Sequence, residues 1–477
     1  MPYSGREIME ATGGVLIRGS AAQVFDAVST DTREPQTGKL FIPLQGPRFD
    51  GHSFLAGAVK NGATGLIIRE GEEGRLRELI EDVTVIRVPD TLSALGAVAR
   101  FWRKKFHVPV MAITGSAGKT TTKEMTAHIM GYIKNTLKTE GNFNNLVGLP
   151  LTILRLRAEH ELAILEMGTN VPGEIGRLCR IAAPDVGLIT NIGPAHLEGL
   201  KSLDVIREEK GALFRSLPEQ GTAVINVDDE AIRALAGRLS GKRVTYGRER
   251  DADVSAEEVA VRAQGLSFIL RIGGSRGKVD MAAAGNHNVM NALAAAATAW
   301  TMGADPKIIR RGLGEFKPIP ARMETIRLKN GAFLIDDTYN ANPVSVREAL
   351  MALRSLQGEH QSAVILGDML ELGERAEELH AEIGGIIAAA GIDALFLKGS
   401  FSRATAAGAL KKGMAASRIF FPDAPEEIIG KLSSFLQEGD WVLVKGSRAM
   451  KMEEVVESIK GTFGLADGRP ELEKNRR

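Results

Sequence analysis

The segment 109–122 constrains this chain most, because an apolar run leads through a glycine-bounded loop into a lysine and several hydroxyls. Residues 110–113 predict a buried strand. Gly115 and Gly118 allow backbone N–H groups to turn toward phosphate oxygens, and a helix that begins at Lys119 adds the positive end of its dipole. A strand, a glycine loop and a helix start in this order predict a site for nucleotide phosphates.

This loop is shorter than the usual phosphate-binding pattern. Ile113 occupies the place of the first glycine, which leaves Gly-x-x-Gly-Lys-Thr. A bare Gly-Lys-Thr is more often an ordinary helix start, but the preceding strand favours the phosphate site. We expect Lys119 to reach the β and γ phosphates and the Thr120 hydroxyl to bind Mg²⁺. The loop residues expected at the nucleotide are Thr114, Gly115, Ser116, Ala117, Gly118, Lys119, Thr120 and Thr121.

Length and charge exclude several classes of protein. The 477 residues suffice for about three domains. With 60 Lys and Arg against 59 Asp and Glu, the net charge of +1 creates no overall field toward nucleic acid or an anionic membrane. The single cysteine, Cys179, excludes an internal disulfide and is expected to be buried. No apolar signal region is visible, and the uncharged span 281–304 is interrupted by asparagines, so we expect a cytoplasmic enzyme without membrane insertion.

Short apolar runs alternate with helical patterns along most of the chain, which predicts an α/β fold with mostly parallel sheets. We divide the chain into blocks 1–88, 89–316 and 317–477. The first block has short strands and is followed by a helical pattern at 91–105. The second holds the phosphate loop, and at 252–281 it changes to the alternation typical of antiparallel strands.

The third block predicts a doubly wound, Rossmann-like domain. It opens with a hairpin at 324–336 that turns at Asn330-Gly331. Apolar strand candidates, each followed by a helical stretch, lie at 363–366, 394–397, 418–421 and 441–444. Ligands are expected at the carboxyl ends of such strands, and the charged tail after Asp467 is expected to fray.

Polar side chains follow several predicted strands. Glu166 ends the apolar run 162–165, where a carboxylate is costly unless it meets a cation; a surface or helix-capping acid is the alternative. His196 lies on a loop, where histidines most often face solvent. Asp337 is one of two adjacent acids at a strand end and either faces a metal-bound nucleotide or forms a turn. Lys210 lies in a helical pattern and by default faces solvent.

Blocks along almost the whole chain resemble one family, the ATP-dependent Mur ligases of peptidoglycan precursor synthesis. In the family's order these blocks are 31–33, 41–46, 50–52, 114–121, 141–145, 166–168, 191–196, 285–288 with Asn291, 322–324 and 337–343. Within the family, 366–373 and 444–448 look most like the members that add D-alanyl-D-alanine to UDP-N-acetylmuramoyl-tripeptide.

The resemblance implies a domain that binds the UDP-sugar peptide, a central ATPase domain and a C-terminal domain that closes over the site and binds the acceptor. It implies that ATP phosphorylates the terminal carboxylate of UDP-N-acetylmuramoyl-tripeptide, and that the amine of D-alanyl-D-alanine then displaces phosphate from the acyl phosphate. A carboxylate alone is a poor electrophile, because its leaving group would be oxide. ATP and Mg²⁺ are the implied cofactors, nucleic acid is no partner, and a monomer is expected.

The resemblance also carries site residues over by position. Thr120 and Glu166 would bind one Mg²⁺, and His196 with Lys210 would bind a second. Because Mg²⁺ repels an ammonium, and family members resolve this by carbamylation, we expect a carbamylated Lys210. Lys119, Lys210 and His196 are the expected catalytic residues.

Other implied contacts lie in all three blocks. Asn288 and Asn291, one helical turn apart, resemble adenine and ribose contacts, with a helix cap or a packed polar residue as the alternative. Arg322 and Asp337 resemble residues that complete the nucleotide site across a domain boundary, so closure about a hinge near 316–318 should assemble the site. The residues that resemble uridine-side contacts are Thr30, Asp31, Thr32 and Arg33.

Four rival functions fit the sequence less well. The ligase that adds the third peptide residue shares the N-terminal layout, but its Asp-Asn-Pro-Arg motif is absent here. Folylpolyglutamate synthase lacks a separate domain like the one before Val88. A P-loop motor would need a basic channel, which the balanced charge disfavours. A non-catalytic precursor-binding protein would have no reason to keep Lys119, Glu166, His196 and Lys210 together.

Overall fold

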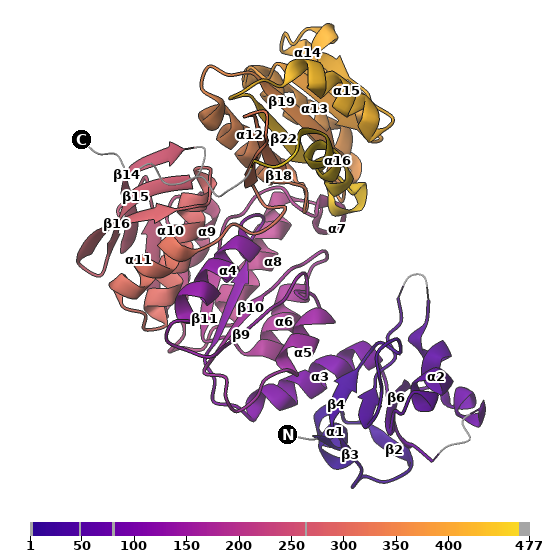
Figure 1. The fold of residues 1–477 in the computed structure, drawn as a ribbon. Helices are drawn as coiled ribbons and strands as arrows, with labels where there is room; N and C mark the ends of the chain where they lie inside the picture. Colours follow the sequence, from indigo (N-terminus) through magenta and orange to yellow (C-terminus); the bar gives the residue numbers. More distant parts are fainter. Residues whose placement is uncertain (1–2, 47–48, 79–81, 263–264, 467–477) are drawn as a thin grey trace.

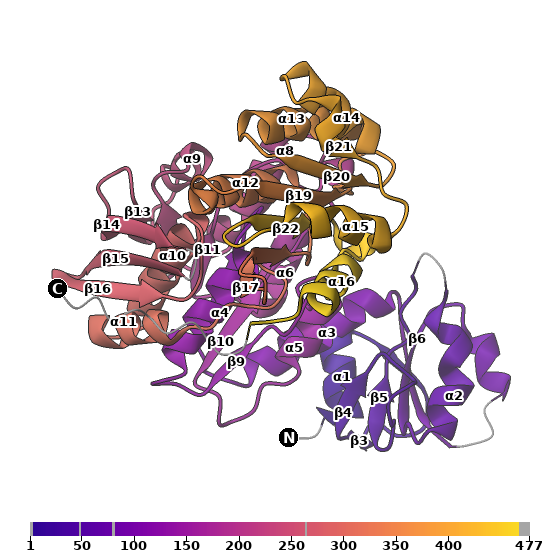
Figure 2. The same cartoon turned by 45° about the horizontal axis from the view of Figure 1, so that its top comes forward.

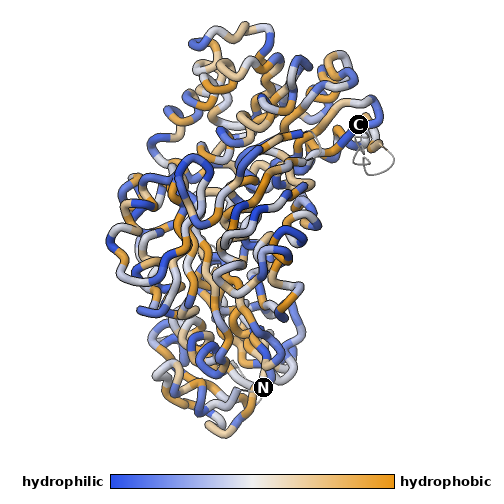
Figure 3. The backbone as a smooth tube through the Cα atoms, turned by 90° about the vertical axis from the view of Figure 1, so that its left-hand side faces the viewer, coloured by the Kyte–Doolittle hydropathy of each residue, from blue (hydrophilic) through white to orange (hydrophobic). Residues whose placement is uncertain are grey.

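The computed structural model describes residues 3–46, 49–78, 82–262 and 265–466, so the tail after Asp467 lies outside it. These residues form three α/β units in a row, with the central unit between the other two (Figure 1). The C-terminal unit lies against one side of the central unit, and the N-terminal unit extends from its other end (Figure 2). Hydrophobic segments follow the interior strands, and hydrophilic segments gather in loops and on outer helical turns (Figure 3). The predicted α/β class is confirmed.

The N-terminal unit is a sheet in the order β2-β7-β6-β5-β4, in which β2 alone of these strands runs antiparallel to its neighbour among the described residues. Ser4 and Glu7 form a capping box that starts the first helix. The elements are β1 (Tyr3–Ser4), α1 (Gly5–Thr12), β2 (Val15–Arg18), β3 (Val24–Phe25), β4 (Ala27–Ser29), β5 (Lys39–Phe41), α2 (Leu55–Lys60), β6 (Gly65–Arg69) and β7 (Thr84–Val88).

Helix α3 (Thr91–Lys104) joins the N-terminal and central units and matches the helix predicted at 91–105. Asp90 caps its start by accepting from Ser93 N. Trp102 packs against Tyr3 with ring centroids 4.3 Å apart, in an apolar core that both units share. This shared core holds the N-terminal unit onto the central one.

The central unit is built on a sheet in the order β16-β15-β14-β13-β12-β11-β8-β10-β9. Strands β8, β10 and β11 are buried along their whole length, because helices cover both faces of a parallel sheet. The elements from β8 to β13 are β8 (Val110–Thr114), α4 (Lys119–Met130), β9 (Thr136–Lys138), α5 (Gly148–Ile153), β10 (Leu162–Glu166), α6 (Glu174–Ala182), β11 (Val186–Ile189), α7 (Leu197–Leu200), α8 (Leu203–Arg215), β12 (Thr222–Asn226), α9 (Glu230–Ala236) and β13 (Lys242–Gly247).

The sheet ends in the antiparallel extension predicted for 252–281. Strand β15 (Gly265–Ile272) pairs antiparallel with β14 (Val254–Arg262) on one side and with β16 (Ser275–Met281) on the other. The alanine-rich helix α10 (His287–Thr301) packs against α4 and the sheet, and α11 (Pro306–Glu315) packs against β16. Cys179, on α6, is buried as predicted, and this burial raises the pKa of its thiol to about 12.

The C-terminal unit has the predicted hairpin and doubly wound sheet, in the order β17-β18-β22-β19-β20-β21. All the neighbours after the β17–β18 hairpin are parallel in the described chain. The strand predicted at 418–421 is shorter, because a 3-10 turn occupies 416–418. The elements are β17 (Glu324–Arg327), β18 (Phe333–Asp337), α12 (Pro343–Gln357), β19 (Ser362–Gly367), α13 (Ala376–Ala389), β20 (Ala394–Lys398), α14 (Ser402–Lys411), β21 (Ile419–Phe420), α15 (Pro425–Phe435), β22 (Trp441–Lys445) and α16 (Glu453–Phe463).

Strand order places the polar loops at one edge of the central sheet. Because β8 lies between β10 and β11, the phosphate loop, Glu166 and Thr190 meet at the carboxyl ends of adjacent strands. Leu197 and Leu200 of α7 share an apolar core with the C-terminal unit, which brings that unit to the same edge. Across the described residues, no helix is both long and apolar enough to cross a membrane.

Candidate active site

The phosphate loop connects β8 to α4 and needs glycine at two positions. Gly118 has φ 76° and precedes the first residue of α4, and Gly115 has φ 153°. A Cβ at Gly115 would lie 1.8 Å from Thr190 Oγ1, and one at Gly118 would lie 2.3 Å from Asn291 Oδ1. The side chains of Thr190, after β11, and Asn291, on α10, therefore lie too close to the loop for any residue larger than glycine at these two positions.

The residues that follow β11 hold the phosphate loop in place through hydrogen bonds. Asn191 Oδ1 accepts from Ser116 N at 3.1 Å and from Ala117 N at 2.8 Å, and Thr190 Oγ1 donates to Ala117 O at 2.6 Å. These two loop amides are already engaged, so the amides at the start of α4 remain to face phosphate oxygens.

Two lysines converge on one carbonyl beneath the loop. Lys119 Nζ donates to Gly115 O at 2.7 Å, and Lys210 Nζ, from α8, donates to the same oxygen at 3.0 Å. Burial lowers the pKa of Lys210 well below its ordinary value, and the nearby Lys119 lowers it further. Burial also lowers the pKa of Lys119, with Glu166 opposing the shift. Lys210 is buried and does not face solvent, and its burial disfavours the charged form of its amine.

Glu166 is buried at the end of β10 and meets two hydrogen-bond donors and a cation. Thr120 Oγ1 donates to Glu166 Oε2 at 2.9 Å, Asn144 Nδ2 donates to Oε1 at 2.9 Å, and Lys123 Nζ lies 4.0 Å from Oε2. A hydroxyl next to a carboxylate is an oxygen donor set that suits Mg²⁺. Thr120 and Glu166 therefore fit the ion that the sequence predicts for them.

His196 and Lys210, the second predicted pair of Mg²⁺ ligands, have different surroundings from Thr120 and Glu166. His196 precedes α7 with φ 54°, and its Nδ1 lies 2.6 Å from Glu371 Oε2 of the C-terminal unit. Lys210 instead binds Gly115 O beneath the loop. In the described residues no group of three or more His, Cys, Asp or Glu could hold a metal ion, so this pair would acquire the charge for a cation only if Lys210 were modified.

Asn288 and Asn291 lie in the first turns of α10 and are buried. Asn288 Nδ2 donates to Ala284 O at 2.7 Å, and its Oδ1 accepts from Asn291 Nδ2 at 3.0 Å. The helix cap is Asn286, so the alternative of an N-cap at Asn288 is wrong. Asn291 Oδ1 accepts from Thr122 Oγ1 of α4 at 3.3 Å, so both amides are held by hydrogen bonds.

Arg322 and Asp337 reach the site from the C-terminal unit. The Arg322 guanidinium lies over the Tyr339 ring, 3.8 Å from its centroid. Lys445 Nζ lies 2.5 Å from Asp337 Oδ2, and Met323 N donates to Asp337 Oδ1 at 3.2 Å. The adjacent Asp336 accepts from Thr338 as a turn residue, so the two acids take different roles.

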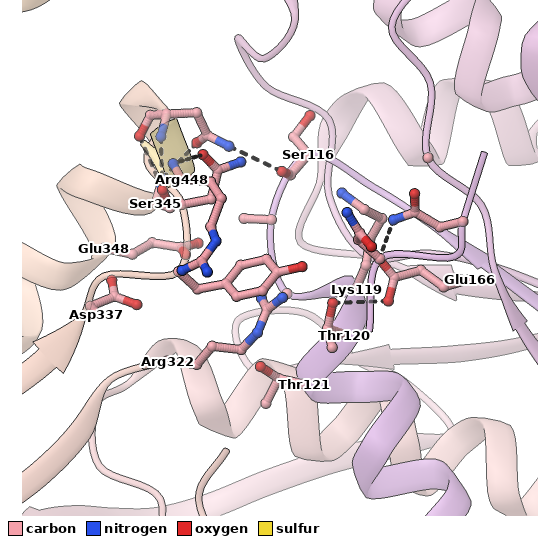
Figure 4. A pocket seen from close by; sticks show the side chains of 18 of the residues that line it. Ser116, Lys119, Thr120, Thr121, Glu166, Arg322, Asp337, Ser345, Glu348 and Arg448 are labelled. Atoms are coloured by element: carbon pink, nitrogen blue, oxygen red, sulfur yellow. Dashed lines mark hydrogen bonds between the residues drawn. The ribbon is translucent and has the colours of Figure 1, made fainter. Parts of the chain in front are cut away.

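A cavity of about 430 Å³ brings these groups together between the central and C-terminal units. Figure 4 shows Lys119, Thr120 and Glu166 on one side of it and Arg322, Asp337 and Glu348 on the other. The predicted residues that line it are Ser116, Ala117, Gly118, Lys119, Thr120, Thr121, Glu166, His196, Asn288, Asn291, Arg322 and Asp337. The cavity lining does not include Thr114, Gly115 or Lys210. Lys210 reaches the phosphate loop at Gly115 O.

The residues Thr30, Asp31, Thr32 and Arg33 lie elsewhere, in the loop after β4 of the N-terminal unit. Arg33 pairs with Asp31 at 2.5 Å, and the Arg33 side chain is 89% exposed. Asn61 Nδ2 donates to Thr32 O at 3.1 Å. The structure does not bring this loop into the phosphate cavity.

Sequence reasoning assigned no role to several residues at the cavity. Asn144 and Lys123 both reach Glu166. Two signals were present in the sequence: Asn144 lies in the family-like block 141–145, and Lys123 follows Lys119 by a helical turn. Glu348 and His287 also line the cavity. Their spacing along the chain gave no sign that they would meet, because they come from separate units.

Comparisons with known proteins agree with this geometry. The Mur ligase middle domain model matches residues 113–299, and the model of the Mur ligase glutamate ligase domain matches residues 321–448. The chain belongs to the Mur ligase family.

Relatives of similar length share a more specific name. UDP-N-acetylmuramoyl-tripeptide–D-alanyl-D-alanine ligase of Bacillus subtilis is 36% identical over 95% of this chain and 97% of its own. A crystal structure of MurF from Acinetobacter baumannii is similar with a TM-score of 0.88, at 32% identity over 97% of this chain and 99% of that one. MurF from Thermotoga maritima in complex with ADP has a TM-score of 0.81, at 28% identity over 92% of this chain and 97% of that one.

Proposed function

We propose that this chain is an ATP-dependent ligase that joins D-alanyl-D-alanine to UDP-N-acetylmuramoyl-tripeptide. The observation that carries the proposal is the single cavity in which a phosphate loop, the Thr120–Glu166 pair and Arg322 from another unit face one another. The relatives that match almost the full length of the chain bear the name of this activity.

The reaction proceeds in two displacement steps. A carboxylate oxygen of the tripeptide attacks the γ phosphorus of ATP, the bond from phosphorus to the β–γ bridging oxygen breaks, and ADP leaves. The neutral amine of D-alanyl-D-alanine then attacks the acyl carbon, loses a proton, and expels phosphate as the carbon–oxygen bond breaks. The C-terminal unit covers the loop and limits the access of water to the acyl phosphate.

The residues around the loop act by position and charge. Lys119 turns from Gly115 O to the phosphates, where its charge offsets that of the moving phosphoryl group. Thr120 and Glu166 would hold Mg²⁺, which supplies positive charge to the phosphate oxygens when bound. Arg322, already oriented by stacking on Tyr339, adds a fixed cation from the C-terminal unit.

Lys210 is proposed to be carbamylated. Carbamylation needs a neutral amine to attack CO₂, and the lowered pKa of this buried lysine makes its neutral form more accessible than that of an ordinary lysine. The product would be an anionic oxygen donor beside Gly115 O, which would remove the repulsion between Lys210 and Lys119 and would supply, with His196, a ligand for a second Mg²⁺.

The remaining assignments extend the proposal to the rest of the chain. Asn288, Asn291 and Asp337 would bind the nucleoside of ATP, as they line the cavity beyond the loop. The loop at 30–33 would bind the uridine side, with residues 1–88, 89–316 and 317–477 as the UDP-sugar peptide, ATPase and acceptor domains and a hinge near 316–318. The cytoplasmic location and the monomeric state stay predictions.

Phosphate release from ATP tests the proposed activity. We expect release only when UDP-N-acetylmuramoyl-tripeptide and D-alanyl-D-alanine are both present, with each omitted in turn as the control. Sustained release without the dipeptide would point to an ATPase motor. A preference for a single amino acid would point to another member of the family.

A further inference from the structure

A fully buried lysine lies next to the candidate magnesium site without lining the cavity. Lys123 is on α4, one helical turn after Lys119, and its side chain is 0% exposed. Its Nζ donates to Thr139 O at 2.5 Å, pairs with Glu124 Oε1 at 2.9 Å and lies 4.0 Å from Glu166 Oε2. Because a buried lysine is costly unless its charge is compensated, these contacts decide what Lys123 does.

Two lysines and two glutamates alternate in a row, in the order Lys138, Glu124, Lys123 and Glu166. Lys138 Nζ donates to Glu124 Oε2, and Lys123 pairs with the other oxygen of the same carboxylate. Burial would raise the pKa of Glu124, but its hydrogen bonds and charge interactions with Lys138 and Lys123 lower it below the ordinary value. Since Lys138 also pairs with Glu124, part of the Lys123 charge remains to offset that of Glu166.

Thr139 fixes Lys123 and Glu166 relative to each other. Its carbonyl accepts from Lys123 Nζ, and its Oγ1 accepts from Glu166 N at 3.0 Å. Asn144 and Thr120 each donate to one oxygen of the Glu166 carboxylate, which faces the cavity beside Thr120 (Figure 4). The carboxylate therefore has little freedom to move away from the lysine.

This arrangement balances the charge of Glu166 while no cation is bound. A divalent cation that arrived alone would lose part of its hydration for one carboxylate whose charge Lys123 already offsets, and Lys123 would repel it. The phosphates of a nucleotide add several negative charges on the cavity side of Glu166, which outweigh one lysine. The site is therefore suited to a cation that arrives with a nucleotide and unsuited to a cation alone.

We propose that Lys123 is a positioning residue that holds Glu166 in place and keeps the site from taking a divalent cation before a nucleotide is present. The inference rests on the proposed role of Thr120 and Glu166 as Mg²⁺ ligands. Nucleotide and cation then strengthen each other's binding, because such coupling is reciprocal.

Binding of Mn²⁺ to the full chain without nucleotide, measured by electron paramagnetic resonance of the free ion, tests this role. We expect Lys123→Gln, which keeps hydrogen-bond donors but loses the charge, to bind Mn²⁺ at least about tenfold more tightly than the wild type. Lys123→Arg, which keeps the charge, should bind it as weakly as the wild type. In Lys123→Gln/Glu166→Gln the gain should disappear, because the carboxylate that binds the ion is gone.

Exposed Lys104, the last residue of α3, provides the matched control, and Lys104→Met should bind Mn²⁺ as weakly as the wild type. Circular dichroism checks that each variant is folded. If Lys123→Gln does not fold, Lys138→Met takes its place, since the Lys138 side chain is 41% exposed. Its loss lets Glu124 draw more of the Lys123 charge, so Mn²⁺ should bind about threefold more tightly.

The inference is wrong if the folded Lys123→Gln variant, or Lys138→Met in its place, binds Mn²⁺ no more tightly than the wild type. It is also wrong if the gain persists in Lys123→Gln/Glu166→Gln, because the ion would then bind elsewhere. Binding of Mn²⁺ does not depend on turnover, so either result leaves the ligase proposal intact. Failure of the ligase proposal would instead appear as a lack of phosphate release from ATP.

Discussion

The side chain of Asn342 donates from Nδ2 to the backbone carbonyl of Ser116 at 3.2 Å, which ties the C-terminal unit to the phosphate loop. Its Oδ1 accepts from Ser345 N at 2.9 Å and caps helix α12. One amide therefore fixes a helix start and the position of that helix over the loop. A second contact between the same two units joins His196 and Glu371, whose Nδ1 and Oε2 atoms lie 2.6 Å apart.

The two roles of Asn342 can be separated by substitution. Asn342→Ser retains a capping oxygen but is too short to reach Ser116, so we expect unchanged stability and a kcat/KM lower by about fivefold. Asn342→Ala loses both roles and should also lose about 1 kcal/mol of stability. Steady-state kinetics and urea unfolding measure the two effects. Full activity in Asn342→Ser would show that this contact does not position the loop.

Lys210 should be sensitive to both substitution and pH. Lys210→Ala is expected to lose nearly all turnover and to regain some when a small carboxylate is added. Because burial and the nearby Lys119 lower the folded pKa of Lys210 well below the ordinary value, a larger share of its amine is neutral than in a free lysine, and that share falls as the pH falls through the folded pKa. The bicarbonate needed for half-maximal rate should therefore rise as the pH is lowered. Undiminished turnover of Lys210→Ala would contradict carbamylation.

Glu166→Gln tests the metal assignment. The change keeps the size of the side chain and an acceptor for Thr120, but it removes the charge that an ion needs. We expect turnover to fall by about 100-fold or more and the Mg²⁺ requirement to rise. Metal-free ATP should bind at least as tightly, since a negative charge near the phosphates is gone. A variant with an unaltered Mg²⁺ titration would exclude Glu166 as a ligand.

The buried pair Asp337–Lys445 should contribute to stability as well as to the site. Asp337→Ala leaves a lysine whose side chain is 2% exposed without its partner, which typically costs about 3–5 kcal/mol. Lys445→Met leaves the Asp337 carboxylate without its lysine partner in the same way. Denaturant unfolding of both single variants and of the double variant Asp337→Ala/Lys445→Met measures the coupling, and we expect the double variant to recover much of the loss. Additive losses would mean that the two groups act independently.

The sequence alone identified the elements that carry local patterns. The strand–loop–helix at 109–122, the antiparallel strands after 252 and the hairpin around Asn330-Gly331 all lie where the pattern predicts them. It also identified Glu166, because a carboxylate that ends an apolar strand must meet a cation or donors. Periodicity, glycine and buried charge are properties of neighbouring residues, so they can be read along the chain.

Tertiary structure alone decided which distant groups meet. Lys119 and Lys210 share one carbonyl, Asn144 and Lys123 both reach Glu166, and Glu348 comes from another unit to the cavity that Asn291 also lines. The order of strands β10, β8 and β11 and the docking of the C-terminal unit create these contacts. Burial and distance set the pKa of each group, and neither exists until the units have packed together.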